Sequence, residues 1–132
     1  HVPASSFAPL ALATLICVFS ATGLGLTGAG IGLLMREQAV LANIMFGVLL
    51  IFTGANVPVD QLPGWMQSIS NVLPFTHGIE AAREVADGAS LSDVADLLAV
   101  EIALGLAYGA FGYLFIRSAE RLSLRHATLD RA

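Results

Sequence analysis

Residues 7–35 read FAPLALATLICVFSATGLGLTGAGIGLLM and are the clearest indication of the fold class. It contains no charged side chain, and its polar residues are Ser, Thr and one Cys, Cys17. A helix of about 20 apolar residues crosses a hydrocarbon core about 30 Å thick. A helix on the outside of a soluble bundle would need a polar stripe at helical spacing, which this stretch lacks. The stretch therefore predicts a membrane-spanning helix.

Two further stretches repeat this composition. Residues 38–59 contain no charged side chain, and residues 97–116 contain one, Glu101. Of the 132 residues, 12% are charged, whereas soluble domains usually hold about 25%. We therefore predict an all-α membrane protein, a single transmembrane domain over residues 1–132 with spans at about 7–35, 39–57 and 94–116.

The start of the chain does not resemble a secretory signal. Residues 1–6 carry no Arg or Lys, and the apolar run that follows exceeds the 7–15 residues typical of a signal peptide. Because the first residue is His1 rather than Met, we expect the chain to be a piece of a longer protein.

The arginines predict how the spans are oriented. Arg36 lies in the short turn between the first two spans, and the tail 117–132 carries four more. The connection 56–96 has one arginine, Arg83, and six of the ten acidic residues. Cytoplasmic loops carry the excess of positive charge, so we expect the turn and the C-terminal tail on the cytoplasmic side. The connection then lies outside, and the protein is a multi-pass protein of the cytoplasmic membrane.

The first half of the connection predicts a short amphipathic helix over residues 61–73. Its apolar side chains recur at helical spacing: Leu62, Trp65, Met66, Ile69, Val72 and Leu73. Asp60 can cap its start, Pro63 is tolerated in a first turn, and Pro74 ends it. A Trp on the apolar face suits the level of the lipid headgroups.

A second short helix is expected over residues 76–87. Thr76 is the expected N-cap and Gly88 the residue after the C-cap. Arg83 is placed to pair with Glu80 and Asp87 on one helix face. Two short helices broken by a proline suggest a re-entrant or interfacial hairpin, lying against other spans, because non-helical backbone at membrane depth must be covered by protein or line a wet cavity.

Small residues within the spans mark expected helix contacts. Gly28 and Gly32 are four residues apart, as are Gly105 and Gly109, and small residues at this spacing let membrane helices approach closely. We expect packing within the subunit rather than dimerisation. Glu101 could belong to a substrate or proton path, but its place near the outer end favours a solvated or paired carboxylate.

Catalytic signatures are not found. His77 and Glu80, with Glu84 one turn further on, are too few for a zinc site with three or four suitable ligands. A Walker A phosphate loop requires lysine, which the chain lacks. We therefore expect no catalytic residues, no metal and no cofactor, and no ATPase site in this chain.

Three segments together resemble the C-terminal half of the ABC-2 type permeases, the membrane subunits of ATP-driven exporters. They are residues 52–58 (FTGANVP), 62–66 (LPGWM) and 73–83 (LPFTHGIEAAR). Within that family the chain is most similar to the drug- and antibiotic-exporter branch, the daunorubicin-resistance permeases. The resemblance covers nearly the whole chain.

The resemblance implies a fold, partners and site residues. The spans would be the last three of six, and the partners a second permease (homodimer or heterodimer), ABC ATPase subunits and membrane lipid, with no nucleic acid. The turn formed by Arg36, Glu37 and Gln38 would face the ATPase. The hairpin would shape the outer mouth; its residues are Pro58, Leu62, Pro63, Trp65, Pro74, His77, Glu80 and Arg83. Substrates would be drug-like, antibiotic or lipid-like molecules.

Two alternatives remain open. Because the first half of the family's pattern is absent, the chain could be a non-transporting scaffold or assembly subunit, or an inactive truncated remnant. An intramembrane enzyme would require a nucleophile or metal cluster that the sequence does not offer.

Overall fold

The computed structural model describes residues 6–35 and 37–129, with side chains as far as Leu122. Within these ranges the regular structure is helical, which confirms the all-α class for this part of the chain. The helices are α1 (Phe7–Gly32), α2 (Gln38–Phe52), α3 (Gly64–Ser70), α4 (Thr76–Ala86) and α5 (Ala95–Leu129), with a short 3₁₀ turn, η2 (Val59–Gln61), before α3.

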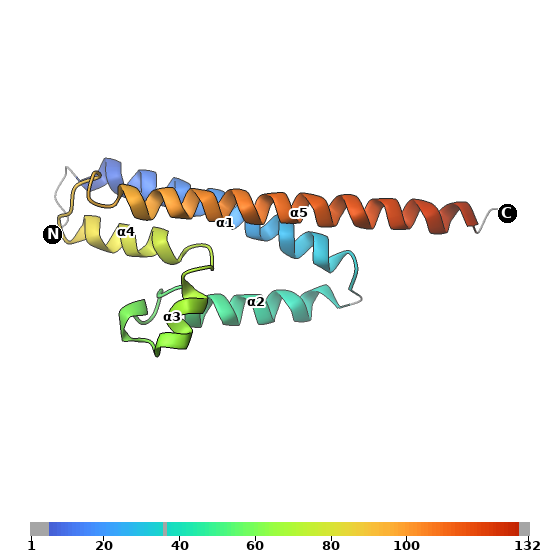
Figure 1. Ribbon diagram of the computed structural model, residues 1–132, viewed down its shortest axis with the longest axis horizontal. Helices are drawn as coiled ribbons and strands as arrows, with labels where there is room; N and C mark the ends of the chain where they lie inside the picture. The colour runs from blue at the N-terminus through green and yellow to red at the C-terminus, as the bar shows by residue number, and fades with distance from the viewer. Residues whose placement is uncertain (1–5, 36, 130–132) are drawn as a thin grey trace.

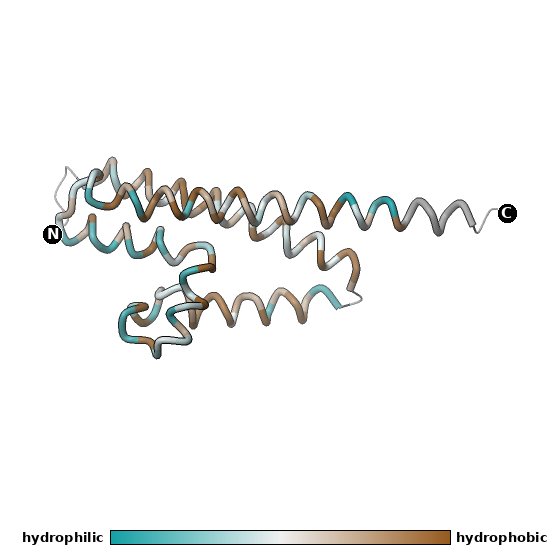
Figure 2. The backbone as a smooth tube through the Cα atoms, in the orientation of Figure 1, coloured by the Kyte–Doolittle hydropathy of each residue, from teal (hydrophilic) through white to brown (hydrophobic). Residues whose placement is uncertain are grey.

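α1 and α5 lie side by side and form the long axis of the molecule (Figure 1). Among the described residues, Phe7–Gly32 and Ala95–Leu122 are the helices long and apolar enough to cross a membrane, by length and composition. Figure 2 shows hydrophobic residues along most of both helices. Two of the three predicted spans therefore correspond to helices of membrane-spanning length.

α2 is shorter than the span predicted at 39–57. It is apolar but contains 15 residues, which rise about 22 Å, less than a hydrocarbon core about 30 Å thick. The helix ends at Phe52 because Gly54, just beyond the C-cap Thr53, adopts a φ of +77°. Glycine adopts this left-handed conformation freely, and it commonly terminates helices.

The connection between α2 and α5 contains two short helices, as predicted, with different boundaries. α3 begins at Gly64 with Pro63 as its N-cap and no side-chain cap, so Asp60 does not cap it as expected. α4 ends at Ala86, with Gly88 in a left-handed conformation just after the C-cap, as predicted. α4 lies along the first part of α5, whereas α3 lies at the end of α2 (Figure 1).

α5 begins at Ala95 and continues beyond the predicted span 94–116. The segment 117–129, expected to be a cytoplasmic tail, is helical. It contains neither Pro nor Gly, the two residues that most strongly disfavour a helix. The end of the apolar stretch is therefore not the end of the helix; residues 130–132 lie outside the described residues.

A small hydrophobic core lies where α1, α4 and α5 meet. Its buried members are Ala13 from α1, Ala81 and Val85 from α4, Val94 just before α5, and Leu98 in the first turn of α5. Elsewhere many large apolar side chains are exposed, among them those of Leu15, Phe46 and Phe111. In a membrane such faces contact lipid tails or neighbouring helices.

Candidate functional site

The most deeply buried ionisable side chain is that of Glu101, on α5. It is 0% exposed and is the largest fully buried side chain among the described residues. Its carboxylate accepts two backbone hydrogen bonds: the N–H of Phe75 donates to Oε1 at 2.7 Å, and the N–H of Gly78 donates to Oε2 at 3.2 Å. Of the two states expected for this carboxylate, solvated or paired, the structure shows the paired one, with backbone amides as its partners.

Glu101 fills the place of an N-cap for α4. The residue at the cap position is Phe75, in a left-handed conformation with a φ of +79° and no side-chain cap. The first amides of a helix have no partner within the helix, and an acceptor from elsewhere can satisfy them. Here that acceptor comes from α5, so the N-terminus of α4 is tied to α5.

Thr76 does not cap α4 as the sequence predicts. It lies inside the helix as its first residue and is 1% exposed. Its Oγ1 is buried and has no hydrogen-bond partner among the described residues. Glu101 has taken the role that was expected of Thr76.

Besides the Glu101 bonds, two contacts join the connection to the long helices. Gly78 of α4 lies so close to Cys17 of α1 that a Cβ at this position would collide with the sulfur. The Tyr108 hydroxyl of α5 donates to the carbonyl of Val72, after α3, at 3.0 Å. The short helices are therefore held on the α1–α5 pair rather than free.

Arg83 makes a different contact from the one predicted. Its Nη2 donates to the carbonyl of Ala55, beyond the end of α2, at 3.1 Å. Among the described residues, this hydrogen bond replaces the ion pairs with Glu80 and Asp87 that the sequence predicted for Arg83. Arg83 thus ties α4 to the segment that follows α2.

The remaining hairpin residues lie on both sides of the Pro74 break. Trp65 of α3 is 65% exposed, and its ring meets that of Phe52 edge to face, with centroids 6.4 Å apart. Pro74 is fully buried. His77 Nδ1 is buried without a hydrogen-bond partner, and the described residues contain no group of three or more His, Cys, Asp or Glu placed to hold a metal.

The contact between α1 and α5 is built from small residues and two hydroxyls. Ser20 Oγ donates to the backbone carbonyl of Glu101 at 2.9 Å, and Thr27 Oγ1 donates to that of Tyr108 at 2.6 Å. A Cβ on Gly105 would lie 2.9 Å from the Phe19 ring. Such bonds between membrane helices contribute about 0.6 kcal/mol each on average.

The predicted packing glycines divide between two places. Gly105 and Gly109 face α1. A Cβ on Gly28 would instead lie 3.5 Å from the Met45 sulfur of α2, and a Cβ on Gly32 would lie 3.4 Å from the Gln38 side chain. A spacing of four residues alone does not mark the face of α1 that packs on α5. That face is marked by small residues at spacings of three and four: Ser20, Gly23, Thr27 and Gly30.

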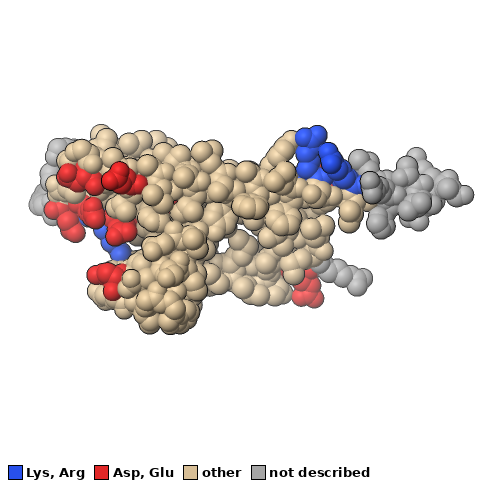
Figure 3. Space-filling model, viewed as in Figure 1, with Lys and Arg blue, Asp and Glu red and all other residues tan. Residues whose placement is uncertain are grey.

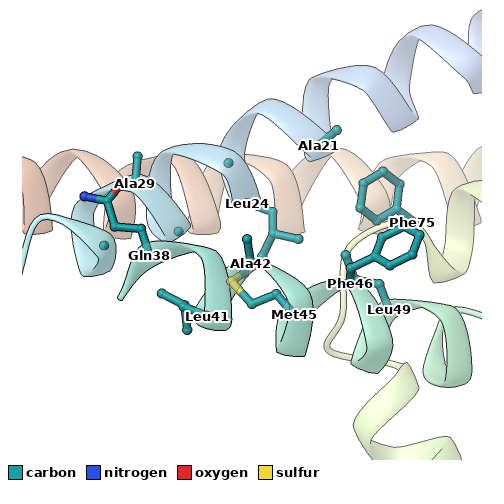
Figure 4. A pocket seen from close by; sticks show the side chains of 13 residues that line it. Ala21, Leu24, Ala29, Gln38, Leu41, Ala42, Met45, Phe46, Leu49 and Phe75 are labelled. Atoms are coloured by element: carbon teal, nitrogen blue, oxygen red, sulfur yellow. The ribbon is translucent and has the colours of Figure 1, made fainter. Parts of the chain in front are cut away.

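An apolar groove of about 460 Å³ separates α1 from α2. Small residues of α1 form one wall and larger side chains of α2 the other. Figure 4 shows Phe46 and Phe75 at one end of this groove and Ala29 and Gln38 at the other. Of the predicted ATPase-facing turn, Gln38 therefore lies at the groove, Glu37 is exposed at the start of α2, and Arg36 lies outside the described residues.

The charged side chains are unevenly distributed along the molecule. Figure 3 shows most acidic side chains at the end formed by α4 and the start of α5, with arginines on the distant part of α5. The latter include Arg117 and Arg121, both exposed. Between the two ends lie the apolar helices.

The chain matches a known family of membrane proteins. A family model described as ABC-2 type transporter matches residues 1–86, which span α1 to the end of α4 and make up more than half of the chain. No curated protein and no solved structure matches.

Proposed function

Since the chain belongs to the ABC-2 type transporter family, and so is a membrane permease component of an ABC transporter, we propose that it helps export drug-like, antibiotic or lipid-like molecules across the cytoplasmic membrane. The family match is the observation that carries this proposal. ATP hydrolysis takes place on a partner ATPase subunit, and a second permease completes the pathway. The residue patterns of the connection favour the daunorubicin-resistance branch of exporters.

The charge distribution supports an orientation. Arg117 and Arg121 lie at the end of the molecule away from the acidic residues of α4 (Figure 3), and arginine is retained on the cytoplasmic side of membranes. The C-terminal end of α5 and the turn 36–38 are therefore cytoplasmic in this proposal. The connection between α2 and α5 lies on the outer side, where it shapes the exit.

α2 serves as the third span in this arrangement. Its 15 residues do not reach across a full hydrocarbon core, and a short span is accommodated by local thinning of the bilayer or by neighbouring helices. The chain leaves α2 at Gly54 and returns through α3 and α4. Glu101 and Tyr108 of α5 fix this return segment to the outer half of the membrane domain.

This proposal is tested by isolating the partner ATPase with the chain and then measuring transport by the complex. The tagged chain, expressed with its genomic neighbours, is purified from membranes and the complex is reconstituted into vesicles. We expect an ABC ATPase to co-purify and a lipophilic dye to move in an ATP-dependent manner. Changing Glu37 and Gln38 together to Ala should reduce ATPase recovery, whereas Ser68→Ala, in α3 on the other side, should not.

The same experiment can contradict the proposal. If no ATPase is recovered and no ATP-dependent movement occurs, the exporter proposal is wrong. A non-transporting scaffold subunit or an inactive remnant would then be the better description of this chain.

A further inference from the structure

One face of α5 changes from apolar to basic along its length. Its residues follow one another at steps of three or four positions, which places them on one side of a helix: Ala110, Leu114, Arg117 and Arg121. All four are exposed, and Figure 3 shows arginine side chains at the surface of this part of α5. The described residues therefore leave this face uncovered.

The opposite face of the same part of α5 packs on α1. A Cβ on Gly30 of α1 would lie 2.6 Å from the Phe115 Cβ and 3.2 Å from the backbone nitrogen of Ile116. Gly112 and Ala119, on the same side of α5 as Ile116, are buried. Because α1 occupies that side, the apolar-to-basic face is left for a partner outside the chain.

Tyr113 orients the guanidinium of Arg117, one turn further along α5. Arg117 Nη1 donates to the Tyr113 hydroxyl at 2.8 Å, and the Arg117 Cζ lies 5.7 Å from the centroid of the Tyr113 ring. A tyrosine hydroxyl can accept and donate at once, and the described residues offer its proton no acceptor. The pair thus presents N–H groups and one O–H to a ligand that accepts hydrogen bonds.

The charges on this face favour an anion. Glu120 is exposed beside the two arginines, but within the described part of the chain no ion pair joins it to Arg117 or Arg121. Two arginines and one glutamate give a net charge of +1. Arg125 continues the four-residue spacing further along α5.

The position of the two arginines indicates which kind of anion fits. Arg117 comes directly after residues 97–116, which contain a single charged side chain. Tyrosine and arginine side chains at the end of such a stretch lie at the level of the lipid headgroups. A phospholipid there meets both the apolar and the basic part of the face, whereas a soluble protein or a free phosphate ion reaches the arginines alone.

We propose that this face of α5 binds an anionic phospholipid of the cytoplasmic leaflet, which carries such lipids. The headgroup phosphate accepts hydrogen bonds from Arg117, Arg121 and the Tyr113 hydroxyl. One acyl chain lies along Ala110 and Leu114. The inference rests on the proposed membrane placement of α5, but not on transport, on ATP or on a partner subunit.

The experiment compares two lipids that differ in headgroup charge. The purified chain in detergent is titrated with dioleoyl phosphatidylglycerol, which is anionic, or with dioleoyl phosphatidylcholine, which is zwitterionic, and bound lipids are counted by native mass spectrometry. Basic residues near a membrane contribute about fivefold each to the binding of anionic lipid. We therefore expect the first phosphatidylglycerol to bind at least about tenfold more tightly than the first phosphatidylcholine.

Three variants locate the site on α5. Arg117→Gln and Arg121→Gln should each weaken phosphatidylglycerol binding about fivefold and leave phosphatidylcholine binding unchanged. Tyr113→Phe keeps the ring and removes the hydroxyl, so it should weaken phosphatidylglycerol binding about threefold. All three positions are exposed, and glutamine is a good helix former, so the fold should be retained.

Two further variants separate local charge from total charge. Glu120→Gln removes the negative charge beside the arginines and should strengthen phosphatidylglycerol binding. Ser68→Glu lowers the net charge by one, as Arg121→Gln does, but at an exposed position of α3; it should leave the preference between the two lipids unchanged. Equal weakening by Ser68→Glu and Arg121→Gln would contradict a site on α5.

Other outcomes would also overturn the proposal. They are equal affinity for the two lipids, phosphatidylglycerol binding that is unchanged in both arginine variants, and displacement of phosphatidylglycerol by an equal concentration of free glycerol phosphate. If the arginine variants instead lost a co-purifying ATPase and kept the lipid preference, the face would be a protein-docking surface. Failure of the lipid test leaves the exporter proposal standing, whereas lipid selectivity without a recovered ATPase supports the lipid site alone.

Discussion

At the scale of single residues, the side chain of Glu101 links α5 to the N-terminus of α4. It is fully buried and accepts the amides of Phe75 and Gly78. Glu101→Gln replaces one of the two carboxylate oxygens by an amide NH₂ group. This group cannot accept a hydrogen bond, and it would face the backbone N–H of Phe75 or Gly78. We expect a loss of about 1–3 kcal/mol in the local free energy of opening, seen as faster hydrogen exchange at Phe75 and Gly78.

The matched control for this prediction is Glu120→Gln. Glu120 lies on the same helix but is exposed, so its replacement should leave exchange at both amides unchanged. Equal protection of Phe75 and Gly78 in the wild-type chain and in Glu101→Gln would contradict the role assigned to Glu101.

Asp93 provides a pH-dependent contact just before α5. Its Oδ2 accepts hydrogen bonds from Ser90 Oγ at 2.7 Å and from the Ser90 N–H at 2.9 Å. These bonds, the side-chain bond first, hold the pKa of Asp93 below its usual value. Because the folded pKa is depressed, the stabilisation is complete above the unfolded pKa of about 3.9. It is lost as the pH falls through the lower folded value.

Replacing Ser90 by Ala tests this assignment. The variant removes the side-chain donor and keeps the backbone donor, so the pKa of Asp93 should rise toward its ordinary value. Carboxyl ¹³C NMR titration of Asp93 in the two proteins measures the change directly. Identical titration curves would show that the hydroxyl of Ser90 does not determine the pKa.

At the scale of helices, the α1–α5 contact depends on the absence of side chains. A Cβ on Gly23 would lie 3.0 Å from the backbone nitrogen of Gly109 and closer still to the Gly105 carbonyl. Backbone atoms cannot move aside as a flexible side chain can. Gly23→Ala should therefore destabilise the pair by about 1–3 kcal/mol, as overpacked sites do, measured by thermal unfolding in detergent.

Gly25 supplies the control from the same helix. A Cβ there meets nothing within 4 Å, so Gly25→Ala should be neutral or slightly stabilising, because alanine favours a helix by about 1 kcal/mol over glycine. If Gly23→Ala were as stable as Gly25→Ala, α1 and α5 would not pack as closely as described.

The sequence predicts these helices better than it predicts their ends. Apolar composition located α1, α2 and α5, and Gly88 marked the end of α4. Hydropathy does not report backbone conformation, however, so it carried the second span through Gly54 and stopped the last span at 116. The capping of α4 could not be found locally, because its acceptor lies on another helix at Glu101.

At the scale of the whole molecule, most acidic side chains lie at one end of an apolar pair of helices, and Arg117 and Arg121 lie toward the other (Figure 3). Such an arrangement orients a protein in a membrane, since arginines remain on the cytoplasmic side. The proposed orientation then predicts that α3 is accessible from outside the cell. It also predicts that the far part of α5 is accessible from the cytoplasm.

Single cysteines provide the test. Cys17→Ala removes the native thiol, and Ser68→Cys or Glu120→Cys adds one at an exposed position of α3 or α5. A membrane-impermeant maleimide should label Ser68→Cys in intact cells and Glu120→Cys only in inverted vesicles. Labelling of both variants from the same side would overturn the orientation. Labelling of Ser68→Cys from the cytoplasmic side alone would invert it.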